Sequence, residues 1–258
     1  MKRIICFVSM CFLLALSLTA LAADPDLVIY YSYDNFGNVV SDESGKGHDG
    51  VVVGDVTPDA NGKRGGAAKF AKGSYLDLSG ENFPTVDVPV DAMTLCVWAK
   101  PENTGDHQAT LNARAEDQTW IIHAEFRSDG RARWLLRSAG GTTIFDIQSG
   151  QWNADQWNHY AGVYSSTDNK AALYLNGEFV AEAAGNSKIA GDWKMGARVG
   201  KNIDDARPFA GLMDDLCIYK RALTQDEIKA VMEGGPQLPS PVPTEDSSTT
   251  TWGNIKNL

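Results

Sequence analysis

Residues 120–137 read WIIHAEFRSDGRARWLLR and contain two runs rich in apolar and aromatic residues on either side of a turn. Ser128, Asp129 and Gly130 form the turn, because small polar residues and glycine adopt the backbone conformations that tight turns require. Two such runs separated by a short turn predict a hairpin of antiparallel strands, Trp120–Phe126 and Arg131–Arg137.

Short runs of the same kind continue along most of the chain in both directions. Asn176 and Gly177 stand between two apolar runs, which is the strongest short-range signal for a second hairpin. Many short strands with little helix predict an all-β fold, a two-sheet antiparallel sandwich or jelly roll. Further strands are expected at Leu27–Tyr33, Ala67–Phe70, Tyr75–Leu78, Met93–Lys100, His159–Tyr164, Ala171–Leu175 and Phe209–Tyr219.

One segment near the C-terminus has the pattern of a short helix. Thr224 and Glu227 have the spacing of a capping box, in which each side chain bonds the other residue's backbone N–H. Ile228, Val231 and Met232 then form one apolar stripe before a Gly-Gly-Pro stop. The sandwich is therefore expected to carry one C-terminal helix of about three turns at most.

Both ends of the chain differ in composition from the part between them. A basic start, an apolar run over Ile4–Leu18 and small residues before position 23 predict a signal peptide at 1–22. This apolar run is short for a membrane span and no second one follows, so we expect a protein secreted to the extracellular space or periplasm, without membrane insertion after cleavage. The β-sandwich domain is expected at 23–235, and the Pro-, Ser- and Thr-rich residues 236–258 as a disordered tail.

The formal net charge of −10 bears on possible partners. Nucleic acids bind clustered Lys and Arg, so an acidic chain argues against a nucleic-acid partner. After removal of 1–22, Cys96 and Cys217 remain. In an oxidising compartment they could form a disulfide, or they could be two buried apolar residues, and the sequence leaves both alternatives open.

Three stretches resemble laminin-G-like domains of the concanavalin A-like lectin/glucanase superfamily. They are YSYD with the DESGKGHDG loop in 31–50, WNHYAGVY with LYLNG in 157–177, and FAGLMDDLCIYKRAL in 209–223. Their order and spacing both match the family. The resemblance implies two curved antiparallel sheets, roles in carbohydrate or protein recognition, and often one bound calcium ion.

A calcium site is predicted in the acidic loop between the first strands. Asp34, Asp42 and Ser44 supply the oxygen ligands that calcium prefers, and nearby glycines allow backbone carbonyls to turn inward. Asp214 matches the first Asp of the closing family motif, so the resemblance implies it as the distant carboxylate. The four histidines are scattered without ligand spacing, which argues against zinc.

A carbohydrate site would need aromatic faces and polar side chains near turns. Trp120, Trp134 and Trp193 flank turns or hairpins and are the predicted platform, as is Trp152. Polar loop residues that could complete such a site include Arg114, Arg127 and Asn202.

The chain shows no paired carboxylates with the strand spacing of a glycosidase, since Glu125 and the other acids are scattered. His123 faintly resembles a polysaccharide-lyase strand, but the rest of that motif is missing, so we interpret it as a core or hairpin histidine. We predict a secreted, non-catalytic module that binds carbohydrate. The alternatives are an extracellular protein-interaction, adhesion or surface-structural module, and a polysaccharide-active enzyme.

Overall fold

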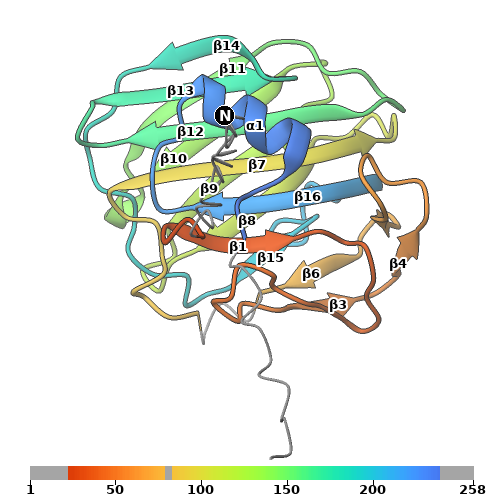
Figure 1. Cartoon of the computed structure of the whole chain (residues 1–258). Helices are drawn as coiled ribbons and strands as arrows, with labels where there is room; N and C mark the ends of the chain where they lie inside the picture. The colour runs from red at the N-terminus through yellow and green to blue at the C-terminus, as the bar shows by residue number, and fades with distance from the viewer. Residues whose placement is uncertain (1–22, 79–82, 239–258) are drawn as a thin grey trace, which may run out of the picture.

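Strands β1 to β16 and one α-helix form two antiparallel sheets in the computed structural model, which describes residues 23–78 and 83–238 (Figure 1). Sheet A has the order β14 (Glu178–Ala183), β13 (Lys170–Leu175), β12 (Asn158–Ser165), β7 (Ala92–Pro101), β16 (Gly211–Tyr219), β5 (Ala67–Phe70) and β4 (Val56–Asp59), and β1 (Leu27–Tyr31) also pairs with β16. Sheet B has the order β11 (Thr143–Ser149), β10 (Ala132–Arg137), β9 (Trp120–Phe126), β8 (Gln108–Arg114), β15 (Ala197–Val199), β6 (Tyr75–Asp77), β3 (Gly50–Val53) and β2 (Val39–Val40). This architecture confirms the predicted two-sheet sandwich.

Both predicted hairpins are present, and their turns have the expected backbone. Gly130, with φ 85°, closes the turn between β9 and β10, where Glu125 pairs with Arg133. Asn176 and Gly177 connect β13 to β14 with φ values of 53° and 76°. Two successive positive φ values match the right-handed twist of the flanking strands.

The core lies between the two sheets and includes the indole of Trp134, which is 0 % exposed. This ring donates from Nε1 to the carbonyl of Val163 at 3.0 Å and lies against Gly162 of the opposite sheet. A Cβ at position 162 would lie 2.6 Å from the indole, so the packing requires glycine there.

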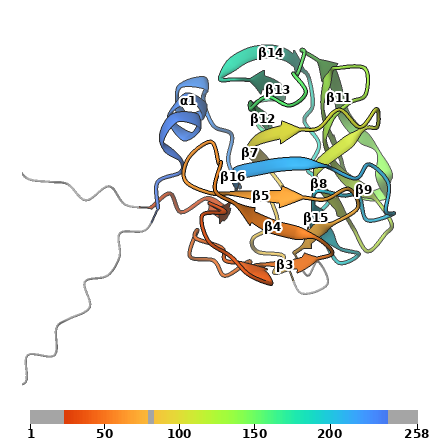
Figure 2. The ribbon, with the colours of Figure 1, turned by 90° about the vertical axis from the view of Figure 1, so that its right-hand side faces the viewer.

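Helix α1 (Gln225–Gly234) covers the outer face of sheet A, away from sheet B (Figure 2). Both bonds of the capping box between Thr224 and Glu227 are present, which confirms the predicted start of the helix. A second apolar cluster fills the space beneath α1 and includes Cys96, Cys217, Ile228 and Val231. In the described part of the chain, the outer face of sheet B has no helix over it.

The predicted signal peptide at 1–22 and positions 239–258 of the predicted tail lie outside the described residues. Within the described residues, no helix is long and apolar enough to cross a membrane.

Candidate functional site

The candidate site lies on the outer face of sheet B, where β9 and β10 run side by side. Along β9, Ala124 and Phe126 enter the core, so His123 and Glu125 project from the other face. Along β10, Trp134 and Leu136 enter the core, which leaves Arg133, Leu135 and Arg137 on the same outer face. The hairpin register then places Glu125 opposite Arg133 and His123 opposite Leu135.

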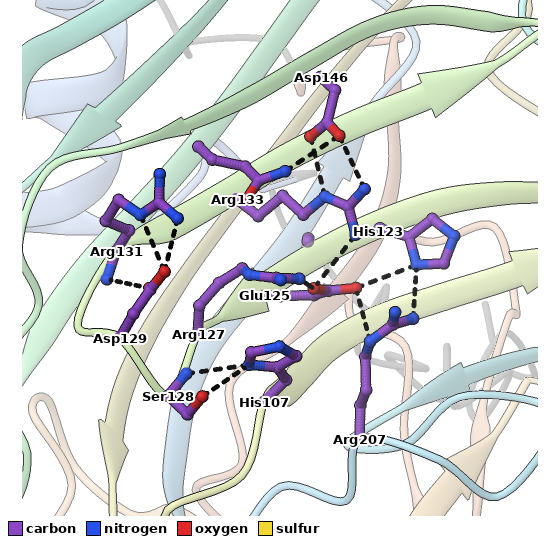
Figure 3. A network of polar contacts seen from close by, with 12 residues as sticks. His107, His123, Glu125, Arg127, Ser128, Asp129, Arg131, Arg133, Asp146 and Arg207 are labelled. Carbon is purple, nitrogen blue, oxygen red and sulfur yellow. Dashed lines mark hydrogen bonds and ion pairs between the residues drawn. The ribbon is translucent and has the colours of Figure 1, made fainter.

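Glu125 is the centre of a polar network on this face (Figure 3). Its carboxylate is 0 % exposed and accepts a hydrogen bond from Arg127 Nη1 at 2.9 Å. Arg133 Nη1 lies 3.6 Å away and Arg207 Nε 3.3 Å away, each close enough for an ion pair. His123 Nδ1 lies 3.0 Å from Glu125 Oε1. A buried carboxylate is tolerated here because positive and hydrogen-bonding groups surround it.

These neighbours control the ionisation of Glu125. Burial alone would raise the pKa of this carboxyl, but the hydrogen bond to His123 and the charges of Arg207 and Arg133 outweigh burial and lower the pKa to about 2. Glu125 is therefore an anion at neutral pH and has no proton to donate.

One tautomer of His123 satisfies its two closest partners. The Glu125 carboxylate can only accept a hydrogen bond, so it requires a proton on Nδ1 of His123. The Arg137 guanidinium can only donate, so it requires an unprotonated Nε2, which lies 3.0 Å from Arg137 Nη1. The neutral imidazole with its proton on Nδ1 meets both requirements. Burial, followed by the charges of Arg207 and Arg133, lowers the pKa of His123 despite the neighbouring carboxylate, so the ring is neutral at pH 7.

Arg207 reaches the network from a loop that folds over β8. In this loop Gly200 and Ile203 donate backbone N–H groups to β8, and the carbonyl of Arg207 accepts from Ala109. Arg207 has φ 52°, a left-handed conformation that non-glycine residues seldom adopt. The loop also buries polar side chains of β8, namely Gln108, Thr110 and Asn112.

Two of the predicted platform tryptophans are not on the surface. Trp134 is 0 % exposed, and Trp193 is 1 % exposed with its ring 4.4 Å from that of Phe83. Their prediction as sugar-stacking residues is wrong, because each fills the core of the sandwich. Proximity to a turn does not reveal which face of a strand or loop is buried.

The remaining predicted ligand residues are divided between surface and interior. Trp120 and Arg114 are half-buried, and the Arg114 guanidinium lies over the Trp120 ring at 4.3 Å. The Trp120 carbonyl accepts from Arg137 Nη1 at 2.8 Å, so this pair borders the Glu125 network. Asn202 is 1 % exposed inside its loop, which contradicts its prediction as an exposed ligand residue.

The four predicted calcium ligands do not form one site. Asp42 accepts backbone N–H groups from Tyr30, Ser44 and His48. The Ser44 hydroxyl lies 2.8 Å from Asp42 Oδ2 and 2.9 Å from the Val28 carbonyl oxygen, and its one proton can bond either acceptor. Asp42 and Ser44 therefore fix the fold of their own loop. Among residues 23–78 and 83–238, no three His, Cys, Asp or Glu side chains are grouped to hold a metal. The described structure does not group Asp34, Asp42 and Asp214 as predicted, and calcium binding itself stays a prediction.

Asp34 and Asp214 share a different partner, the loop at positions 62–66. Asp34 Oδ1 accepts from the N–H of Gly66 at 2.7 Å, and Asp214 Oδ2 accepts from the N–H of Arg64 at 2.9 Å. Asp214 Oδ1 is buried and has no hydrogen-bond partner among the described residues. Burial, together with the charge of Asp215, raises the pKa of Asp214 to about 7. Asp214 thus keeps one carboxylate oxygen available for a hard cation such as calcium.

Cys96 and Cys217 lie directly opposite each other on β7 and β16. Both are buried beneath α1 and are free thiols in this structure. Direct pairing on adjacent strands brings them within reach of each other, and the disulfide stays a prediction.

The sequence-based interpretation missed the network around Glu125. The sequence predicts Glu125 as one of several scattered acids and His123 as a core or hairpin histidine. In the structure their side chains form a hydrogen bond. A signal was present in the alternation of His123, Glu125 and Arg127 with apolar residues across the turn from Arg133 and Arg137. Alternate residues of a hairpin share one face, so these side chains could have been placed together from the sequence.

The two antiparallel sheets and the C-terminal helix over one of them define a two-sheet β-sandwich. A family model described as the concanavalin A-like lectin/glucanases superfamily matches residues 70–229. The chain belongs to this superfamily, as the sequence motifs predicted.

Individual relatives are more distant. Domain 4 of AbnA, an extracellular arabinanase of Geobacillus stearothermophilus solved with arabinotriose, is 25 % identical with a TM-score of 0.64, over 80 % of this chain and 98 % of that chain. The CBM40 domain of a Ruminococcus gnavus sialidase, bound to α2,3 sialyllactose, is 20 % identical with a TM-score of 0.54, over 64 % of this chain and 95 % of that chain, and shows the fold alone. The pentraxin-related protein PTX3 of Mus musculus is 22 % identical over 59 % of this chain and 42 % of that protein, so the match spans less than half of PTX3.

Proposed function

We propose that this protein is a secreted, non-catalytic module that binds carbohydrate on the outer face of sheet B. The observation that carries the proposal is the Glu125 network, which gathers planar guanidinium groups on the sheet face that α1 leaves uncovered. Sugar hydroxyls pair with such donors, and the half-buried Trp120 lies at the border of the network. The arabinotriose bound to the AbnA domain supports this ligand class.

Binding without cleavage agrees with the state of the carboxylates on this face. A glycosidase needs one carboxylic acid that can donate a proton to the leaving group. Glu125 is buried and has a pKa of about 2, and Asp146 accepts hydrogen bonds from Nε and Nη2 of Arg133, both at 2.8 Å. Neither group is suited to that role.

A glycan array with the full secreted chain, run in calcium and in chelator, tests the proposal. We expect binding to a defined class of glycans, reduced by substitution of Trp120 to Ala. A chain that is folded by circular dichroism and binds no glycan in either condition would contradict carbohydrate binding and favour a protein partner.

The proposal includes a calcium ion held by Asp34 and Asp214. The ion would join Asp34, in the loop after β1, to Asp214 on β16 and stabilise the fold, since a ligand that binds only the folded state raises the melting temperature. Calcium should therefore raise the melting temperature of the wild type, and Asp214→Asn should abolish that rise, whereas Asp91→Asn on the exposed surface should retain it. An identical melt in calcium and chelator would exclude the ion.

Secretion is tested by the N-terminus of the chain recovered from the periplasm or medium of an expression host. We expect the chain to begin near Ala23. A product retained in the cytoplasm with an intact N-terminal segment would contradict this part of the proposal.

A further inference from the structure

The Glu125 network carries more positive than negative charge. Four guanidiniums take part, from Arg127, Arg133, Arg137 and Arg207, against the carboxylates of Glu125 and Asp146. His123 is neutral, so the network has an excess of two positive charges. The whole chain has a formal net charge of −10, which makes this face a local exception. An anionic ligand would be attracted by this face and repelled by the acidic remainder of the surface.

Neither Arg137 nor Arg207 has a carboxylate that pairs with it alone. Arg137 donates only through Nη1, to the Trp120 carbonyl and His123, and it contacts no carboxylate among the described residues. Its Nε and Nη2 have no partner there, and they are not among the buried unpartnered atoms, so they reach solvent. Arg207 shares Glu125 with two other arginines, and its Nη2 likewise has no partner in the described structure.

His123 lies between these two guanidiniums. Arg137 Nη1 lies 3.0 Å from its Nε2, and Arg207 Nη1 lies 3.2 Å from its Nδ1. Because Nδ1 already donates to Glu125, the Arg207 contact sets two N–H groups against each other rather than forming a hydrogen bond. Burial and, to a lesser extent, the charges of Arg133 and Arg207 lower the pKa of Arg137. The two positive charges therefore repel each other across His123, and an added anion would stabilise them.

A carboxylate of the protein itself is bound by an arginine on the same face. Arg133 binds Asp146 through Nε and Nη2, both at 2.8 Å, in a two-pronged contact. The Asp146 side chain is 31 % exposed, so the pair lies at the surface rather than in the interior. Guanidinium and carboxylate match in this geometry, which makes arginine the preferred residue for planar anions.

We propose that Arg137 and Arg207 bind an anionic group of the glycan, a carboxylate or a sulfate ester, so that the preferred ligand is an acidic polysaccharide. This inference rests on the proposed function, because it names the class of sugar that the same face takes. Arg137 offers two unpartnered donor nitrogens, Nε and Nη2, and Arg207 offers one, Nη2.

The test is affinity electrophoresis of the full secreted chain in gels that contain matched polymers. Polygalacturonate is compared with highly methyl-esterified pectin, and dextran sulfate with dextran, so that each pair differs in charge on the same backbone. We expect retardation by one or both anionic polymers and at least tenfold weaker binding to the neutral partner. Retardation by polygalacturonate alone assigns a carboxylate, and by dextran sulfate alone a sulfate ester.

Variants connect the binding to the two arginines. Arg137→Gln should weaken binding about tenfold, and Arg137→Lys should restore part of it, because lysine retains the charge without the planar fork. Arg131→Gln is the matched control, since Arg131 lies on the same hairpin but is exposed and paired with Asp129. Arg207→Gln is read together with its melting curve, because Arg207 also neutralises Glu125.

Two outcomes would overturn the inference. The inference would be refuted by equal affinity for charged and neutral polymers, or by an equal loss of affinity in Arg137→Gln and Arg131→Gln. Either result would leave carbohydrate binding intact and exclude a preference for acidic glycans. Binding to none of the four polymers, by a chain that does bind neutral glycans on the array, would do the same. A folded chain that binds no glycan in any assay would reject both proposals.

Discussion

Replacement of Glu125 by Gln tests the charge network directly. The pKa of this carboxyl falls from 4.5 to about 2 on folding. Each unit corresponds to about 1.4 kcal/mol, so the ionised carboxylate stabilises the folded state by about 3 kcal/mol at pH 7. Glu125→Gln removes this charge and leaves the surrounding guanidiniums without their shared partner. We expect a loss of about 3 kcal/mol, which in a domain of this size lowers the melting temperature by about 6–12 °C.

The stabilisation by the Glu125 carboxylate should decrease as the pH falls. A carboxyl with a lowered folded-state pKa contributes its full stability above the unfolded value near 4.5, and the contribution disappears as the pH falls toward 2. Urea unfolding of wild type and Glu125→Gln at pH 7 and pH 3 should show a difference at pH 3 that is less than half of that at pH 7.

A control separates this effect from the general loss of acidic charge. Glu116 forms an exposed ion pair with Lys194, and such pairs contribute little, so Glu116→Gln should leave the unfolding free energy unchanged. A difference between wild type and Glu125→Gln that stays constant from pH 7 to pH 3, or a variant as stable as wild type at pH 7, would refute the reasoning.

Three further predictions concern the core packing, the helix cap and the cysteine pair. Gly162→Ala places a Cβ 2.6 Å from the indole of Trp134 and should cost about 1–3 kcal/mol in urea unfolding. Thr224→Ala removes the capping box of α1 and should cost about 1 kcal/mol in the same assay. If Cys96 and Cys217 are bridged in the secreted protein, thiol titration in denaturant should detect no free thiol until reductant is added.

Each of these has a result that would count against it. Gly37 is exposed with nothing within 4 Å of an added Cβ, so Gly37→Ala is the control, and equal effects at positions 37 and 162 would exclude the steric argument. Unchanged unfolding of Thr224→Ala would mean that tertiary contacts alone hold the helix. Two free thiols per secreted chain would show that the pair stays reduced.

Local signals in the sequence were sufficient for much of the fold. Gly130 and Asn176-Gly177 fix hairpin turns through backbone conformations that few other residues adopt, and Thr224 with Glu227 fixes the start of α1. Several short or mixed strands were not predicted, among them β8 and β11, whose sequences QATLNAR and TIFDIQS combine polar and apolar residues. The polar residues of β8 are buried by the loop at 200–209, a contact that strand patterns do not reveal.

The sequence by itself determined the class of fold and the hairpin that carries the site, because turn and capping chemistry acts over a few residues. Only the tertiary structure decided which tryptophans are buried, since a strand's two faces are distinguished by the sheet that packs on them. It also decided the charge balance of the site. Arg207 follows His123 by 84 positions and reaches it only through the loop folded over β8. Electrostatic interactions depend on distance in space, and for these residues that distance is set by the packing of the whole sandwich.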